Sequence, residues 1–172
     1  MTQASESNQQ GASLVEFALI LPILLSLLLG TVTAALSFSS SLSLNNAARE
    51  TARFGATLPV DPDIGVWLNE VADVSISSAT GDLDSGVPGR SVCVAYVNPA
   101  GTAPDDSTTM LTIDEDGVRT TTVGSTCFAD GRPLDERRVQ VRLERETDLN
   151  VLFFSNTITL TRDATVRFER VS

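Results

Sequence analysis

The chain has 172 residues, which is enough for a membrane anchor and one ordinary domain but too few for two large domains. Its 12 basic residues are all arginine and face 22 acidic residues, so the formal net charge is -10. This balance excludes a broad basic surface for nucleic acid. Because the sequence contains no histidine, Ser-His and Cys-His nucleophile pairs and histidine-ligated zinc are also excluded.

The first element in the chain is an uncharged apolar run over residues 17–36. At about 1.5 Å per residue, a helix of this length matches a bilayer core of about 30 Å. A buried helix of a soluble domain is the alternative, but such helices normally have a polar face, and no charge occurs between Glu16 and Arg49. We therefore predict a membrane-spanning helix.

A cleaved secretory signal would instead remove this segment. Such signals combine a basic start with an apolar core of roughly 7 to 15 residues and a small-residue cleavage site. Here the apolar run is longer, no Arg or Lys precedes it, and the cut would fall near Ala34 or Ala35. We therefore favour the retained anchor.

A carboxylate stands at the start of the apolar run, at Glu16. A carboxylate inside a membrane costs roughly 2.5 to 3.5 kcal/mol, so a functional partner is one explanation. The other is a glutamate in the first helical turn, favoured by the helix dipole and by head groups. Gly11 precedes it by five positions; if the chain is cut after Gly11, the new amine of Ala12 lies one helical turn from Glu16 and can neutralise it.

These residues resemble a known family. The segment GASLVEFALILPILLSLLLG, residues 11–30, and the segment NNAARETARFGA, residues 45–56, resemble the type IV prepilins and more closely the TadE-like minor pilins of the Tad (Flp) pilus system. The resemblance implies that a membrane-embedded prepilin peptidase cuts between Gly11 and Ala12, and that Glu16 guides subunit docking. Unlike most prepilin leaders, residues 1–11 contain no Arg or Lys.

The helix is predicted to continue to residue 58 because no proline interrupts residues 37–58. A stripe of mostly small residues follows helical spacing and can pack either against the chain's own domain, which we favour, or against another subunit; it consists of Leu44, Ala47, Ala48, Thr51, Ala52 and Gly55. On the same segment, Glu50 and Arg53 have the spacing of a surface ion pair.

Residues 59–172 predict a mainly antiparallel sheet, because alternating or β-branched stretches are separated by Gly, Pro, Asp and Asn. The predicted strands are residues 71–77, 91–97, 109–113, 118–123, 139–145 and 157–171. Asp163 is expected to divide the last of them by a turn or bulge, and the charged run ending at Arg138 is expected to be solvated.

Cys93 and Cys127 are the only cysteines, which favours a disulfide in an oxidising compartment, with two buried thiols as the alternative. The acidic run Asp114, Glu115 and Asp116 offers oxygens for Ca²⁺ but does not match an EF-hand loop. A β-hairpin turn explains it better. We assign no metal, cofactor or catalytic residue and predict that the protein is not an enzyme.

The predicted fold class is α+β: a leader at 1–11, a long N-terminal helix at 12–58 with its transmembrane span at about 17–36, and an extracytoplasmic β-rich domain at 59–172. The resemblance implies a minor pilin-like subunit in the cytoplasmic membrane, incorporated in a surface pilus. Its implied partners are the prepilin peptidase, other pilin subunits and the Tad assembly machinery. A single-pass anchored binding module is the alternative function.

Overall fold

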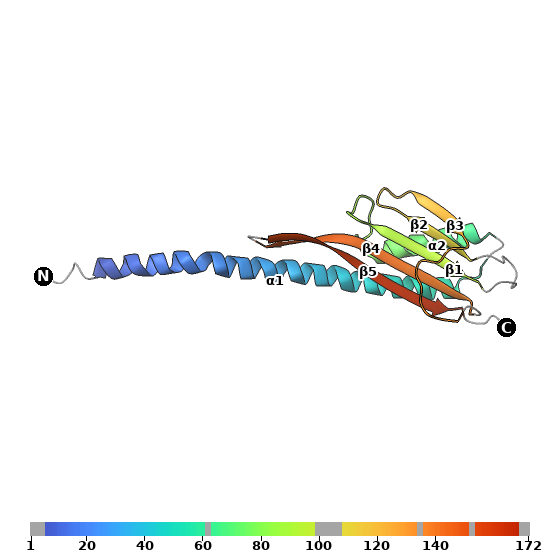
Figure 1. Cartoon of the computed structure of the whole chain (residues 1–172), viewed down its shortest axis with the longest axis horizontal. Helices are drawn as coiled ribbons and strands as arrows, with labels where there is room; N and C mark the ends of the chain where they lie inside the picture. Colours follow the sequence, from blue (N-terminus) through green and yellow to red (C-terminus); the bar gives the residue numbers. More distant parts are fainter. Residues whose placement is uncertain (1–5, 61–62, 99–107, 134–135, 152–153, 169–172) are drawn as a thin grey trace. The chain divides into compact units, whose positions relative to one another are not determined.

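The computed structural model describes residues 6–60, 63–98, 108–133, 136–151 and 154–168. Two helices precede five strands along the chain (Figure 1), which confirms the predicted α+β class. The chain divides into two compact units. The first comprises Met1–Phe38 together with Asp148–Thr157, and the second comprises Ser39–Thr147 together with Ile158–Ser172.

Helix α1, Glu6–Thr57, is continuous through Pro22. Leucine and alanine favour the helical conformation. Hydroxyl groups within the apolar part bond back to backbone carbonyls one turn earlier: Ser26 donates to Ile23 at 3.0 Å, and Thr31 donates to Leu28 at 2.8 Å. The few polar side chains of this segment are thereby satisfied inside the helix itself, as an apolar surrounding requires.

The second unit is built on an antiparallel sheet in the order β3-β2-β1-β4-β5 (Figure 1), as predicted. Its central strand β1 places Val94 opposite Leu111 of β2 and opposite Val141 of β4. The strands are β1 (Ser91–Val97), β2 (Thr109–Ile113), β3 (Arg119–Val123), β4 (Arg138–Val151) and β5 (Phe154–Arg167).

The strand predicted at residues 71–77 is wrong, because these residues belong to helix α2, Ile64–Ser78. Asp63 caps its start, accepting a hydrogen bond from the backbone N–H of Gly65 at 2.9 Å. The buried positions of α2 recur at helical spacing rather than at every second residue. They are Trp67, Leu68, Val71, Ala72 and Ser75.

The expected break at Asp163 is also wrong. Strand β5 continues through this residue. The Asp163 carboxylate accepts hydrogen bonds from Nε and Nη2 of Arg142, each at 2.8 Å. A cross-strand partner therefore satisfies the carboxylate within the sheet, and no turn is needed.

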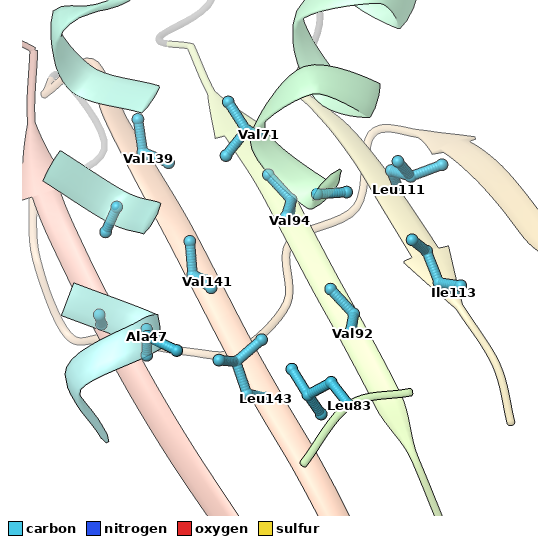
Figure 2. Packing of buried hydrophobic residues seen from close by; sticks show 14 of the residues in the cluster. Ala47, Val71, Leu83, Val92, Val94, Leu111, Ile113, Val139, Val141 and Leu143 are labelled. Carbon is cyan, nitrogen blue, oxygen red and sulfur yellow. The ribbon is translucent and has the colours of Figure 1, made fainter. Parts of the chain in front are cut away.

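The hydrophobic core lies between one face of the sheet and the two helices (Figure 2). Val139, Val141 and Leu143 occupy alternate positions of β4 and are buried on this face. The small-residue stripe of α1 packs there, which confirms the prediction that it contacts its own domain. Five of its residues are at most 1% exposed: Leu44, Ala47, Ala48, Thr51 and Ala52.

The outward side of α1 differs from the predicted arrangement. Arg49, Glu50 and Arg53 are exposed. Among the ion pairs of the described residues, none joins Glu50 to Arg53. Helical spacing alone does not hold two solvated side chains together, because such a pair contributes only a few tenths of a kcal/mol.

Gly55 sets how closely α1 approaches the rest of the core. A Cβ added there would lie 3.2 Å from side-chain atoms of Trp67, Val71 and Val139. The helix therefore needs a residue without a side chain at this position, which explains why the stripe ends in glycine.

We expect Gly55→Leu to lower the free energy of unfolding by about 1 to 3 kcal/mol, because the new side chain overpacks the core. Urea unfolding of the full chain in detergent, followed by the fluorescence of Trp67, measures this change. Arg53→Leu on the exposed side of the same helix is the control and should stay within about 0.5 kcal/mol of the wild type. Equal losses in the two variants would contradict the close-approach argument.

Candidate functional site

The N-terminal half of α1 presents apolar side chains on every side. Each residue from 12 to 25 is exposed, and Phe17, for example, is 60% exposed. Among the described residues, one helix is long and apolar enough to cross a membrane, and its most apolar stretch has a mean hydropathy of 2.4. So large an apolar surface marks contact with lipid or with other protein.

The residues predicted for processing and docking lie at the start of this surface. Gly11, Ala12 and Glu16 all belong to α1, and the Glu16 side chain is exposed. Residues four apart in an α-helix share one face at a separation of about 6 Å. The backbone thus brings Ala12 and Glu16 together, which is the arrangement that an amine and a carboxylate need in order to pair.

The sheet face opposite the helices is covered by the loop of residues 124–133, here called the disulfide loop. Cys93 of β1 and Cys127 of this loop form a disulfide, with their Cα atoms 5.8 Å apart. The Phe128 ring lies under the guanidinium of Arg142, 5.0 Å from ring centroid to Cζ. These contacts attach the loop to β1 and β4.

A buried ion pair holds the same loop. The Asp130 carboxylate accepts hydrogen bonds from Arg138 Nε at 2.7 Å and from Gln140 Nε2 at 2.8 Å. Burial raises the pKa of Asp130, but hydrogen bonds from Gln140, from the backbone of Arg132 and from Arg138 outweigh it, so the pKa lies below its ordinary value of 3.8.

The position of Arg138 corrects the expectation of a solvated charged run, since its side chain is only 3% exposed. Side chains alternate between the two faces of a strand, so Arg138 and Gln140 lie on the face of β4 opposite its buried valines. We therefore expected these two side chains to be exposed to solvent. The disulfide loop covers that face instead. The predicted disulfide could have indicated this burial, because a bond between Cys93 and Cys127 has to bring the residues near Cys127 over the sheet.

Beside this ion pair lies an open hollow of about 590 Å³, whose lining includes Thr126, Phe128 and Asp130. Its buried charged groups Asp130 and Arg138 are bonded to each other, with the Arg138 guanidinium also donating to the Pro133 carbonyl at 2.9 Å. The third charged residue of the lining, Arg132, is exposed and pairs with Glu136. The hollow therefore offers a ligand no uncommitted buried charge, and we assign it no binding role.

The acidic run at residues 114–116 forms the predicted hairpin turn between β2 and β3. Asp114 Oδ1 accepts from the Val118 N–H at 2.8 Å, and Gly117 has φ of 85°, a conformation that glycine adopts without strain. Glu115 accepts from the Gly89 N–H at 3.2 Å. In the part of the chain that the structure describes, no group of three Asp, Glu, Cys or His residues could hold a metal ion.

The geometry defines a class of protein, in which a long N-terminal helix with an apolar N-terminal half is followed by a disulfide-bonded domain of helix and sheet. A family model for TadE-like protein matches residues 11–53, a quarter of the chain. The match confirms the resemblance to TadE-like pilins, a structural family without enzymatic activity, and connects the chain to Tad pilus function. With the apolar helix, it indicates a single-pass membrane anchor.

No curated protein and no solved structure matches the chain. The resemblance to the family therefore rests on residues 11–53, which include Gly11, Glu16 and the small-residue stripe up to Ala52. The β-rich part of the chain lies outside the match, so what it does has to be argued from its own residues.

We predict that the Asp130 ion pair makes the sheet domain sensitive to acid. Because folding lowers the pKa of Asp130, its stabilisation is present above the ordinary value of 3.8 and is lost as pH falls through the folded-state pKa. Asp130→Asn should flatten this acid-induced loss. At neutral pH it should cost about 1 to 3 kcal/mol, since the buried Arg138 loses its charged partner.

Urea unfolding of the two proteins at a series of pH values between neutral and strongly acidic tests both effects. The matched control is Asp116→Asn in the exposed β2–β3 turn, which should follow the wild-type curve. An Asp130→Asn variant with unchanged acid dependence would show that Asp130 does not carry the proton linkage.

Proposed function

We propose that this chain is a minor pilin-like subunit of a Tad-type pilus, processed after Gly11, that acts in assembly, initiation or capping of the filament. The observation that carries the proposal is the TadE-like match over 11–53, on a helix whose N-terminal half is apolar and exposed on all sides. Its partners are the prepilin peptidase, other pilin subunits and the assembly machinery. The outer domain lies on the extracytoplasmic side.

Processing after Gly11 changes the charge at the start of the helix. Cleavage of the Gly11–Ala12 peptide bond removes residues 1–11 with their acidic Glu6 and leaves a protonated amine on Ala12. Removal of the leader thus places a cation where the uncut chain has a neutral peptide group. The amine and Glu16 then form a pair of opposite charges one helical turn apart.

Docking follows from the cost of leaving Glu16 unpaired near lipid. No charged residue occurs between positions 16 and 49. In a bundle of such helices, the Ala12 amine of a neighbouring subunit is, besides the chain's own amine, a cation at the right depth for Glu16. A mismatch in axial position would separate the charges, so the pair sets the register between subunits while the apolar side chains supply contact area.

The division of α1 limits where the subunits meet. The stripe from Leu44 to Ala52 is buried in the chain's own domain. Contacts between neighbouring helices therefore fall on the apolar part from Ala12 to Leu42, where the side chains are mainly exposed. This separation lets a bulky outer domain remain folded whether the subunit is alone in the membrane or part of a bundle.

We expect the mature protein isolated from membranes to begin at Ala12. Intact mass and N-terminal sequencing of the extracted chain measure this, with and without the prepilin peptidase. The Gly11→Val variant should retain residues 1–11, as should the wild-type chain in cells without the peptidase, while Gly30→Ala on the same helix should be cut normally. A functional chain that still begins at Met1 would contradict the proposal.

For Glu16→Gln we predict normal processing but a severe loss of piliation, because the amide keeps the shape of the side chain and removes its charge. Glu50→Gln, exposed on the same helix beyond the apolar part, is the matched control and should assemble normally. Electron microscopy of pili and sequencing of the extracted chain provide the readouts. Full piliation of Glu16→Gln would refute the docking role; full piliation after deletion of the whole gene would favour an anchored binding module instead.

A further inference from the structure

Strand β3 is the last strand at one side of the sheet (Figure 1), so no described strand pairs with its outer edge. Hydrogen bonds at its two ends show which backbone groups face β2. The Gly124 N–H donates to the Thr108 carbonyl at 2.7 Å, and the Val118 carbonyl accepts from the Asp114 N–H at 3.2 Å. Because backbone groups alternate between the two edges of an antiparallel strand, the even-numbered residues of β3 bond to β2 and the odd-numbered residues point away.

The odd-numbered residues of β3 therefore direct a row of N–H and C=O groups out of the sheet. These residues are Arg119, Thr121 and Val123. Their side chains lie on the same face as the buried residues of β2 with which they pair. All three are nevertheless exposed, and Val123 is 66% exposed. Open backbone groups on an exposed strand are a template for pairing with another strand.

β3 lacks the features that usually protect such an edge, such as lysine, proline or a bulge. It contains no lysine or proline, and its pairing with β2 runs without a bulge from Arg119 to Val123. Its only charged side chain is held by its own domain, because the Arg119 guanidinium donates to Asn69 Oδ1 and to the Asp73 carboxylate of α2. The edge is therefore open to a further strand.

The charge around β3 favours a second copy of this chain as the source of that strand. The protein carries a formal net charge of -10, which tends to keep two copies apart. No acidic residue occurs between Asp116 and Asp130, however, and this stretch contains β3 with the positive charge of Arg119. Two copies can therefore meet along β3 without placing carboxylates opposite each other.

Symmetry fixes the register of such a contact. Two copies related by a two-fold axis present the same surface to each other, so β3 pairs antiparallel with itself. The outward groups are symmetric about Thr121, which then lies opposite Thr121 of the other copy, while Arg119 lies opposite Val123. Every outward N–H and C=O of these residues finds a partner, and Thr120 lies opposite Thr122 on the other face. The two arginines are separated by about 14 Å along the strands, so their repulsion is small.

We propose that the outer edge of β3 pairs with β3 of a second copy, in antiparallel register centred on Thr121, and joins the two sheets into one. With 5 residues in each strand, the contact is far smaller than the about 20 to 30 residues a side of a stable interface. It is therefore weak by itself and forms where copies are concentrated. The inference goes beyond the proposed function and depends on neither cleavage nor pilus assembly.

Thiol cross-linking of the full chain in detergent, over a series of protein concentrations, tests the pairing. Both native cysteines are joined in a disulfide, so Thr121→Cys supplies one free thiol. Residues opposed in this way have Cα atoms about 5.5 Å apart, within reach of a short bis-maleimide. We expect a cross-linked dimer whose yield rises with concentration and exceeds several-fold that of Ser77→Cys, a matched control at an exposed position of α2.

A proline distinguishes strand pairing from mere proximity. Val123→Pro removes an N–H that points away from β2, so the chain's own sheet keeps its hydrogen bonds and the emission of Trp67 should not change. Added to Thr121→Cys, it should reduce the dimer to the level of Ser77→Cys, whereas Val123→Thr should not. Equal yields from Thr121→Cys and Ser77→Cys would refute the pairing. So would a dimer that persists with the proline, or a cross-link formed only with a different protein when Thr121→Cys is treated in cell membranes.

Discussion

An apolar helix surface that its own domain does not cover is the constraint on which the rest of the molecule depends. The same helix has two surroundings: from residue 12 to 25 every side chain is exposed, while Leu44 and Ala47 are fully buried in the core against the sheet. Burial of apolar surface drives both halves to find partners. The C-terminal half finds them in the sheet, and the N-terminal half has to find them in lipid or in other protein.

Much of this arrangement was predictable because it depends on simple periodicities. Hydrophobicity without a polar face identified the span, and alternation identified β1, β2 and β3 to within one residue at each end. Strand β4 continues to Val151, six residues past the predicted strand. Helix α2 was missed because Val71, Val74 and Ile76 are β-branched and favour strands. The cap at Asp63 and the helical spacing of the buried residues favour a helix instead of a strand. The packing of Trp67 in the core decides in favour of the helix.

The sequence alone could not indicate which polar side chains of the sheet are buried. Arg138 and Arg142 occupy equivalent positions on β4, but the first is almost wholly covered and the second is about one-third exposed. The difference comes from where the disulfide loop lies, and loop placement depends on contacts far apart in sequence. Likewise, the motif at Gly11, Ala12 and Glu16 predicts a local geometry, whereas the partner that we propose for it belongs to another molecule.

The way α1 is joined to the sheet has a mechanical consequence. Its C-terminal half lies along the core, with the Ser43 hydroxyl donating to the Ala79 carbonyl at 3.0 Å and Gly55 against Val139 a dozen residues later. Tension applied through the N-terminal segment therefore loads these contacts in shear, so they resist together rather than yielding one after another. A chain connected in this way can transmit a pulling force from the N-terminal half of α1 to the sheet.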